Sequence, residues 1–250
     1  MTTLLSQMKS LLRGGEGHAP PPVGAVRFGD LRRLEPVSQV WGFDRGVPID
    51  RYYIEAFLQR EAARIRGCVL EIGDNSYTRR FGGDRVTVSD VLHVTPGAPG
   101  ATIIGDLTRA EHIPSNRFDC VILTQTLQLI YDVPAAIRTL VRVLKPGGVV
   151  LATVPGITPI SDETWSRQWY WNFTTLSATR VFGDQFPDSH VTVTTWGNLL
   201  SAMAFLQGLA AEELTAAELA HVDPRYEVTI AVCATKPDSS LRDAVAGDVQ

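Results

Sequence analysis

The sequence has no apolar run that approaches the roughly 20 residues needed to span a membrane. It has no basic surplus either: 23 lysines and arginines stand against 27 aspartates and glutamates, and the net charge of −4 argues against nucleic acid as a partner. Residues 1–22 contain no long apolar stretch and no small-residue cleavage site, which argues against a signal peptide. We therefore expect a cytoplasmic protein that acts on a small molecule, without membrane or nucleic-acid partners, as a monomer or homodimer.

Cysteine is also scarce. The chain has only Cys68, Cys120 and Cys233, and their spacing matches no metal-binding motif. Each lies in or beside an apolar, strand-like run, which is typical of buried free thiols in a reducing compartment. We therefore expect no disulfide and no metal site.

Composition divides the chain into four stretches. Residues 1–24 end in a glycine- and proline-rich run and are expected to form a flexible arm. Residues 25–66 are expected to form a helical cap, whose first helix is capped by Asp50 and runs to Gly67. The main domain is expected at 67–236, followed by a polar tail at 237–250.

Within the main domain, apolar strands alternate with helical patterns. The strands are expected at residues 68–73, 86–90, 101–106, 118–125, 148–155, 190–196 and 226–236, with helices at 132–148 and 198–214. Continuous apolar strands alternating with helices are typical of a parallel sheet covered on both faces. The sequence therefore predicts an α/β fold with a doubly wound, mostly parallel sheet.

Ligands of such sheets bind beyond the carboxyl ends of the strands, where this chain places acidic residues. Glu71, Asp90 and Asp106 lie at the ends of the first three predicted strands. The first loop, "VLEIGDNSYTRRFGG" at 69–83, has a single early glycine, Gly73, followed by Asp74. A phosphate-binding loop needs more glycines and would be repelled by these carboxylates, whereas a cationic nucleoside would be attracted. Asp90 lies where an acid chelates ribose hydroxyls, and Asp106 where one accepts from the adenine amine.

In these features the chain resembles the class I S-adenosylmethionine-dependent methyltransferases, over residues 50–235. The resemblance rests on "VLEIG" at 69–73, "SD" at 89–90, "GDL" at 105–107 and residues 118–155, which include the turn "LKPGG". It implies a seven-stranded sheet with a reversed last strand, S-adenosylmethionine as cofactor and S-adenosylhomocysteine as product. Residues 42–58 and 71–86 are similar to a bacterial subgroup often found alongside glycosyltransferases.

The resemblance also assigns cofactor contacts. The expected cofactor residues are Tyr53, Glu71, Gly73, Asp74, Asn75, Tyr77, Asp90, Val91, Gly105, Asp106, Leu107, Thr124, Gln125 and Thr126. Asn75 and Tyr77 stand where the family usually has its later glycines. Asn75 is expected to adopt a positive φ there. Tyr77, with Arg79 or Arg80, either grips the methionine carboxylate or replaces a turn, in which case the arginines are solvated or pair with Asp84.

The catalytic group is less clearly marked. A hydroxyl nucleophile usually needs a general base, and residues 125–129 after the fourth strand offer no ionisable side chain. The candidate bases are His93, Asp162 and His221. Arg51 and the tryptophans Trp165, Trp169 and Trp171 are expected to bind substrate, although the tryptophans equally suit an aromatic core.

We therefore expect methyl transfer to a small polar metabolite, a sugar-like molecule or natural-product intermediate, with oxygen as the favoured acceptor. Two alternatives stay open. One is an enzyme that uses the cofactor's charge in a non-methylating step such as a cyclisation. The other is an inactive, methyltransferase-like partner protein whose degenerate first loop no longer binds the cofactor.

Overall fold

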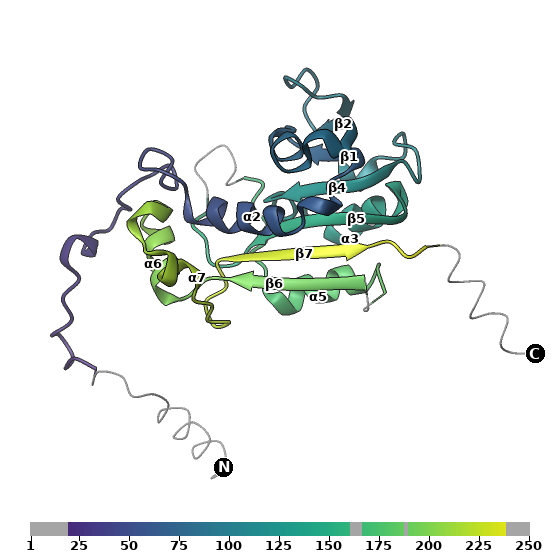
Figure 1. The fold of residues 1–250 in the computed structure, drawn as a ribbon. Coiled ribbons are helices and arrows are strands. Elements are labelled where there is room, and N and C mark those ends of the chain that lie inside the picture. The colour runs from purple at the N-terminus through teal and green to yellow at the C-terminus, as the bar shows by residue number, and fades with distance from the viewer. Residues whose placement is uncertain (1–19, 161–166, 188–189, 239–250) are drawn as a thin grey trace, which may run out of the picture. The chain divides into compact units, whose positions relative to one another are not determined.

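A seven-stranded sheet with the strand order β3-β2-β1-β4-β5-β7-β6 forms the centre of the computed structural model (Figure 1). The structure describes residues 20–160, 167–187 and 190–238. The strands are β1 Gly67–Ile72, β2 Val86–His93, β3 Ile103–Ile104, β4 Phe118–Thr124, β5 Leu144–Pro155, β6 Val191–Trp196 and β7 Thr229–Thr235. Strand β7 is antiparallel to β5 and β6, while the remaining neighbours pair in parallel. The predicted sheet with its reversed last strand is confirmed.

Helices cover both faces of this sheet, with α2 in front and α3 and α5 behind in the view of Figure 1. The helices are α2 Ile49–Arg60, α3 Val133–Val143, α5 Thr175–Gly183, α6 Leu199–Leu206 and α7 Ala216–Ala220. Two details of the predicted first helix are wrong. Its N-cap is Pro48, because Asp50 already lies inside the helix, and Gly67 opens β1. The single predicted helix at 198–214 is α6 followed by a short 3₁₀ turn at Ala211–Glu213.

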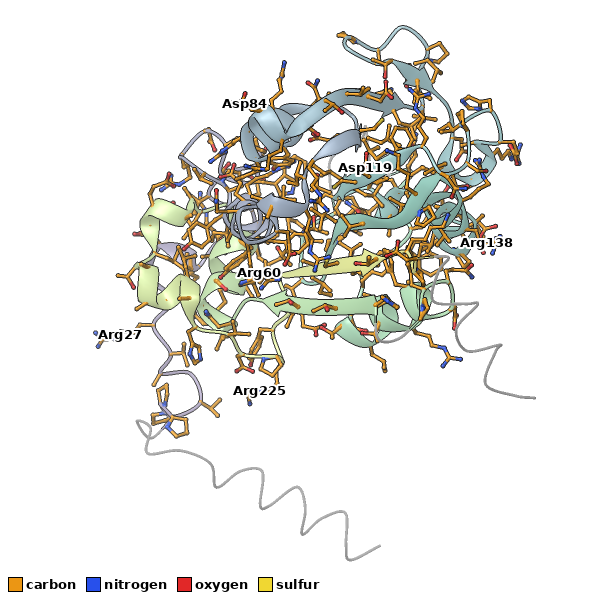
Figure 2. The ribbon with its side chains drawn as sticks, turned by 45° about the vertical axis from the view of Figure 1, so that its right-hand side comes forward. Arg27, Arg60, Asp84, Asp119, Arg138 and Arg225 are labelled. Atoms are coloured by element: carbon orange, nitrogen blue, oxygen red, sulfur yellow. The ribbon has the colours of Figure 1, made fainter. Side chains whose placement is uncertain are left out.

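The alternation of β4 shows how the sheet separates two cores. Cys120 and Ile122 pack with Phe57 of α2 on one face, whereas Val121 and Leu123 pack with α3 on the other. All of these strand residues are fully buried. Burying one such aliphatic or aromatic side chain contributes about 1.5–3 kcal/mol, so both faces hold the sheet in place. Figure 2 labels Arg60 at the end of α2. Its guanidinium lies over the Trp196 ring, 5.2 Å from the ring centroid.

The chain forms two compact units, residues 1–34 and 35–250. The described part of the first contains a short 3₁₀ helix, Gly29–Leu31, with the Arg32 guanidinium 5.3 Å from the Phe28 ring centroid. In the second unit, the segment before α2 packs against the end of α6. The Val37 N–H donates to the Gln207 carbonyl at 2.8 Å, and Pro48 forms a β-bridge with Ala210. These contacts fix where α2 begins.

Strand β2 extends three residues further than predicted, and this changes the position of Asp90. Asp90 lies in the body of the strand and is only 7% exposed. Its Oδ1 accepts from the Thr102 hydroxyl at 2.9 Å, and its Oδ2 accepts from Arg117 at 2.6 Å. The prediction that Asp90 ends the strand is wrong, because its buried carboxylate is held by these two donors.

Within the described residues, no helix is long and apolar enough to cross a membrane. The three cysteines are free, as expected; Cys120 and Cys233 are buried and Cys68 is half-buried. Burial raises the pKa of the Cys233 thiol to about 11. Since the thiolate is the reactive form, Cys233 is expected to be inert at neutral pH.

We expect Asp90→Ala to lower the free energy of unfolding by about 1–3 kcal/mol, because Thr102 and Arg117 lose their buried acceptor. Urea or thermal unfolding measures this change. Asp84→Ala is the matched control, since Asp84 is exposed (Figure 2) and should change stability by less than about 0.5 kcal/mol. Equal stability of the two variants would contradict a structural role for Asp90.

Candidate active site

A cleft of about 1420 Å³ opens at the carboxyl ends of β1, β2 and β4, beside the start of α2. Ten of the predicted cofactor residues line it: Glu71, Gly73, Asp74, Tyr77, Gly105, Asp106, Leu107, Thr124, Gln125 and Thr126. The cleft is therefore where the sequence placed the ligand, at the strand ends of a parallel sheet.

Gly73 turns the chain away from β1 at the cleft. Its φ is +93°, a conformation that favours glycine, and its N–H donates to the Leu92 carbonyl at 3.0 Å. A Cβ built on Gly73 would meet no atom within 4 Å. The backbone at Gly73 therefore presents an open face on which a ligand can lie closely.

Glu71 holds the loop that follows. Its carboxylate is 3% exposed and accepts from the backbone N–H groups of Tyr77 at 3.2 Å and Thr78 at 2.7 Å. Burial raises the pKa of Glu71, and the hydrogen bonds from Thr78 and Tyr77 offset only part of that effect. The acid of the first motif thus fixes the loop through its backbone.

Tyr77 and Arg51 connect this loop to α2. The Tyr77 backbone has φ −72°, so this position does not need a glycine, and Asn75 does not adopt the expected positive φ. The Tyr77 ring is buried against Phe81, with its centroid 6.0 Å away. Its hydroxyl accepts from Arg51 Nη1 at 2.8 Å.

Arg51 is the cation best placed to bind an anion in the cleft. It is half-buried, lines the cleft and forms no ion pair with a carboxylate in the described part of the chain. Arg80 also lines the cleft, but it pairs with Glu55 at 2.5 Å. Arg79 is exposed, and among the described residues neither arginine pairs with Asp84. The guanidinium of Arg51 therefore keeps donors for a ligand carboxylate.

The loop after β4 is held in a strained conformation. Gln125 has φ +46°, which is uncommon for a residue other than glycine, and its N–H donates to the Thr153 carbonyl at 2.9 Å. The Gln128 side chain donates to the Gln125 carbonyl at 2.9 Å. Such strain persists only where neighbouring contacts impose it, and it is common at ligand sites.

Asp106 begins the loop after β3. Its Oδ1 accepts from both the N–H and the hydroxyl of Thr108, at 2.8 and 2.9 Å. Both bonds use Oδ1, so Oδ2 is the carboxylate oxygen left to accept from a ligand. An exocyclic amine is a donor of the kind that Oδ2 can bind.

The cleft is electronegative. Among the described residues, five carboxylates line it, against the two guanidinium groups of Arg51 and Arg80; the five are Glu55, Glu71, Asp74, Asp106 and Asp132. Burial raises the pKa of Asp74, but hydrogen bonds from Ser76 outweigh this effect and lower the pKa below its usual value. The Asp74 carboxylate is therefore charged at neutral pH. A cationic ligand suits this lining better than a polyphosphate does.

Four predicted cofactor residues lie outside the lining of the cleft. Tyr53 is buried on α2, where its hydroxyl donates to the Leu219 carbonyl at 3.1 Å. Asn75 donates from its side chain to the Ser89 hydroxyl at 3.1 Å. Asp90 and Val91 lie in the body of β2. These four side chains stabilise the scaffold around the cleft.

The predicted substrate and base residues are distributed differently. Trp165 and Asp162 lie outside the described residues. Trp171 donates from Nε1 to the Ile130 carbonyl at 3.0 Å, and Trp169 bonds to Asn172, but neither lines the cleft. His221, after α7, does not line it, whereas His93 does.

Four residues that line the cleft were not among the individually predicted site residues, although three of them lie in the segments 41–55 and 160–174 between which the site is expected. Phe43, Tyr131, Gln168 and Tyr170 line the cleft, and the Tyr131 and Tyr170 rings lie 5.4 Å apart between centroids. Tyr131 also stacks on Trp171 at 5.9 Å. Tyr170 lies inside the aromatic run that the sequence singled out, so the signal was present but pointed to the neighbouring tryptophans.

Comparisons with known proteins agree with the fold. Residues 84–152 match a family model described as a methyltransferase domain. The structure is similar to the [4+2]-cyclase SpnF, with a TM-score of 0.52 and 17% identity over 78% of this chain and 85% of that one. It is also similar to phosphoethanolamine N-methyltransferase 2 of Haemonchus contortus in complex with S-adenosyl-L-methionine, with a TM-score of 0.52 and 16% identity over 80% of this chain and 56% of that one.

A third similar structure is an S-adenosylmethionine-dependent methyltransferase from Archaeoglobus fulgidus, with a TM-score of 0.50 and 12% identity over 74% of this chain and 94% of that one. At such identities these likenesses show the fold alone. No curated protein sequence matches the chain significantly.

We expect Tyr77→Phe to weaken binding of S-adenosylhomocysteine about tenfold, because Arg51 loses the acceptor that orients its guanidinium. Arg51→Gln should weaken binding further. Isothermal titration calorimetry measures both. The control ligand is 5′-methylthioadenosine, which lacks the amino-acid carboxylate. It should bind the wild-type protein and both variants equally. Equal losses for both ligands would contradict a carboxylate contact.

Proposed function

We propose that the chain is a class I S-adenosylmethionine-dependent methyltransferase, which transfers the cofactor's methyl group to an oxygen of a small polar acceptor. The observation that carries this proposal is the electronegative cleft at the strand ends, open at Gly73. Its carboxylates suit a sulfonium, and its single early glycine suits a nucleoside without phosphates.

The lining residues fit the parts of this cofactor. Asp106 and Leu107 offer an acceptor and an apolar wall to the adenine, while Gly73 allows close approach of the backbone. Arg51, oriented by Tyr77, offers its guanidinium to the methionine carboxylate. Thr124, Gln125 and Thr126 border the same space. When bound, the cofactor supplies a methyl group on a sulfonium, which is already activated for displacement.

The size of the cleft supports a second ligand beside the cofactor. Small-molecule sites commonly measure about 300–1,000 Å³, and this cleft is larger, at about 1420 Å³. Tyr131 and Tyr170 line it together with the polar Gln168. Aromatic rings with nearby polar groups suit the apolar face and hydroxyls of a sugar-like molecule. The resemblance of residues 42–58 and 71–86 to a subgroup found alongside glycosyltransferases supports the same acceptor class.

The chain's own contribution to the reaction is to orient the acceptor and take its proton. His93 does not suit the second task, because its Nδ1 already accepts the Thr95 N–H at 2.9 Å. Two lining carboxylates remain as candidates: Asp132 directly follows Tyr131, and Glu55 lies on α2, where it pairs with Arg80. We assign the proton to one of these two.

The alternatives of a non-methylating enzyme and an inactive partner make different predictions. The likeness to SpnF shows that this fold also serves a cyclase. We expect methyl-labelled S-adenosylmethionine, incubated with the protein and a fractionated pool of polar metabolites, to pass its label to one metabolite with equimolar S-adenosylhomocysteine. An unlabelled, isomeric product would instead support cyclisation. Absence of S-adenosylhomocysteine binding by calorimetry would support the inactive partner.

We expect Glu55→Gln or Asp132→Asn to lower kcat by about 10²-fold or more, the typical contribution of a general base. Affinity for S-adenosylhomocysteine should change little. Glu61→Gln is the matched control on α2's C-terminal side, since Glu61 pairs with Arg60 and does not line the cleft. Unchanged kcat in both cleft variants would contradict the assignment.

A further inference from the structure

His93 ends β2 where the loops that follow β1 and β3 meet it. The carbonyl of Leu92 accepts from the Gly73 N–H, and the carbonyl of His93 accepts from the Gly105 N–H, both at 3.0 Å. Both glycines line the cleft, and so does His93. His93 therefore occupies the ligand-facing end of β2.

Asp90, the carboxylate of β2, does not reach a ligand in the cleft. It lies three residues before the end of β2, does not line the cleft, and uses its two oxygens for Thr102 and Arg117. Turning the carboxylate toward the cleft would leave the Arg117 guanidinium and the Thr102 hydroxyl without it. Strand β2 therefore offers the cleft an imidazole instead of a carboxylate.

The hydrogen bond to Thr95 determines what the imidazole can do. His93 Nδ1 accepts from the Thr95 N–H at 2.9 Å, so Nδ1 carries no hydrogen. The hydrogen of the ring is then on Nε2, which makes Nε2 a donor. The ring is half-buried and held by this bond. A carboxylate at this place would accept from ribose hydroxyls, whereas His93 has only a donor to offer.

We propose that His93 recognises the ribose of the nucleoside cofactor by donating its Nε2–H to one hydroxyl oxygen. This proposal rests on the proposed use of S-adenosylmethionine. A carboxylate binds both hydroxyls at once, but a single imidazole donor binds one of them. Recognition of the ribose by this chain is therefore concentrated on one hydroxyl.

The test is calorimetry with S-adenosylhomocysteine and its 2′-deoxy and 3′-deoxy counterparts. The wild-type protein should bind the ribose form about tenfold more tightly than one of the two deoxy ligands, the value of one hydrogen bond. His93→Ala should lose that preference. His93→Asn should keep part of it, because an asparagine can accept the Thr95 N–H through Oδ1 and donate through Nδ2. The matched control, Asp90→Asn, should keep the wild-type preference.

Two results would overturn the inference alone. His93→Ala could weaken the binding of all three ligands by the same factor, which would mean that His93 stabilises the loop and does not contact the ribose. Alternatively, Asp90→Asn could remove the ribose preference while His93→Ala keeps it. A wild-type protein that binds none of the ligands is a separate result, since it overturns the proposed function and this inference with it.

Discussion

The cleft depends on one buried interaction, the Glu71 carboxylate with the backbone N–H groups of Tyr77 and Thr78. A buried carboxylate is costly unless hydrogen-bonded, so Glu71 draws the chain after β1 back toward the strand end. That fold-back leaves Gly73 as the residue that turns at positive φ. It also buries the Tyr77 ring and brings its hydroxyl to Arg51 on α2. The loop therefore forms although this chain has Asn75 and Tyr77 where the family motif has its later glycines.

The same arrangement divides the cleft into two chemical regions. Near β1 and β3, the carboxylates and the open backbone at Gly73 suit a cationic nucleoside, and Arg51 adds a guanidinium to this region. In the segments after β4 and β5, Tyr131 and Tyr170 provide aromatic surface, and Trp171 stacks on Tyr131 and donates to the Ile130 carbonyl. A cofactor and an acceptor placed in these regions would meet inside one cleft, which is the geometry that transfer of a group between them requires.

Much of the fold was readable from the sequence, because apolar periodicity reports burial directly. The order β4–α3–β5 was predicted correctly, and so was the reversed β7 that the family resemblance implied. The predicted boundary between α3 and β5 was wrong, because α3 ends at Val143 and residues 144–148 belong to β5. Strand ends were less readable. The pattern "VTVSDVLHV" contains a polar pair at Ser89 and Asp90 that looks like a boundary, yet β2 continues through it to His93. Arg117, 27 residues away, supplies the charge that lets Asp90 stay inside the strand.

The sequence by itself determined the sheet, the acidic character of the strand ends and the glycine at position 73, since each follows from local composition and spacing. Only the tertiary structure decided which side chains face the ligand. Tyr53 and Asp90 have the right chemistry but are engaged by Leu219 and Arg117, whereas His93 and Tyr170 line the cleft. The physical reason is that a polar side chain already hydrogen-bonded within the protein has fewer groups left for a ligand. Which partner it bonds depends on packing between segments that are far apart in the chain.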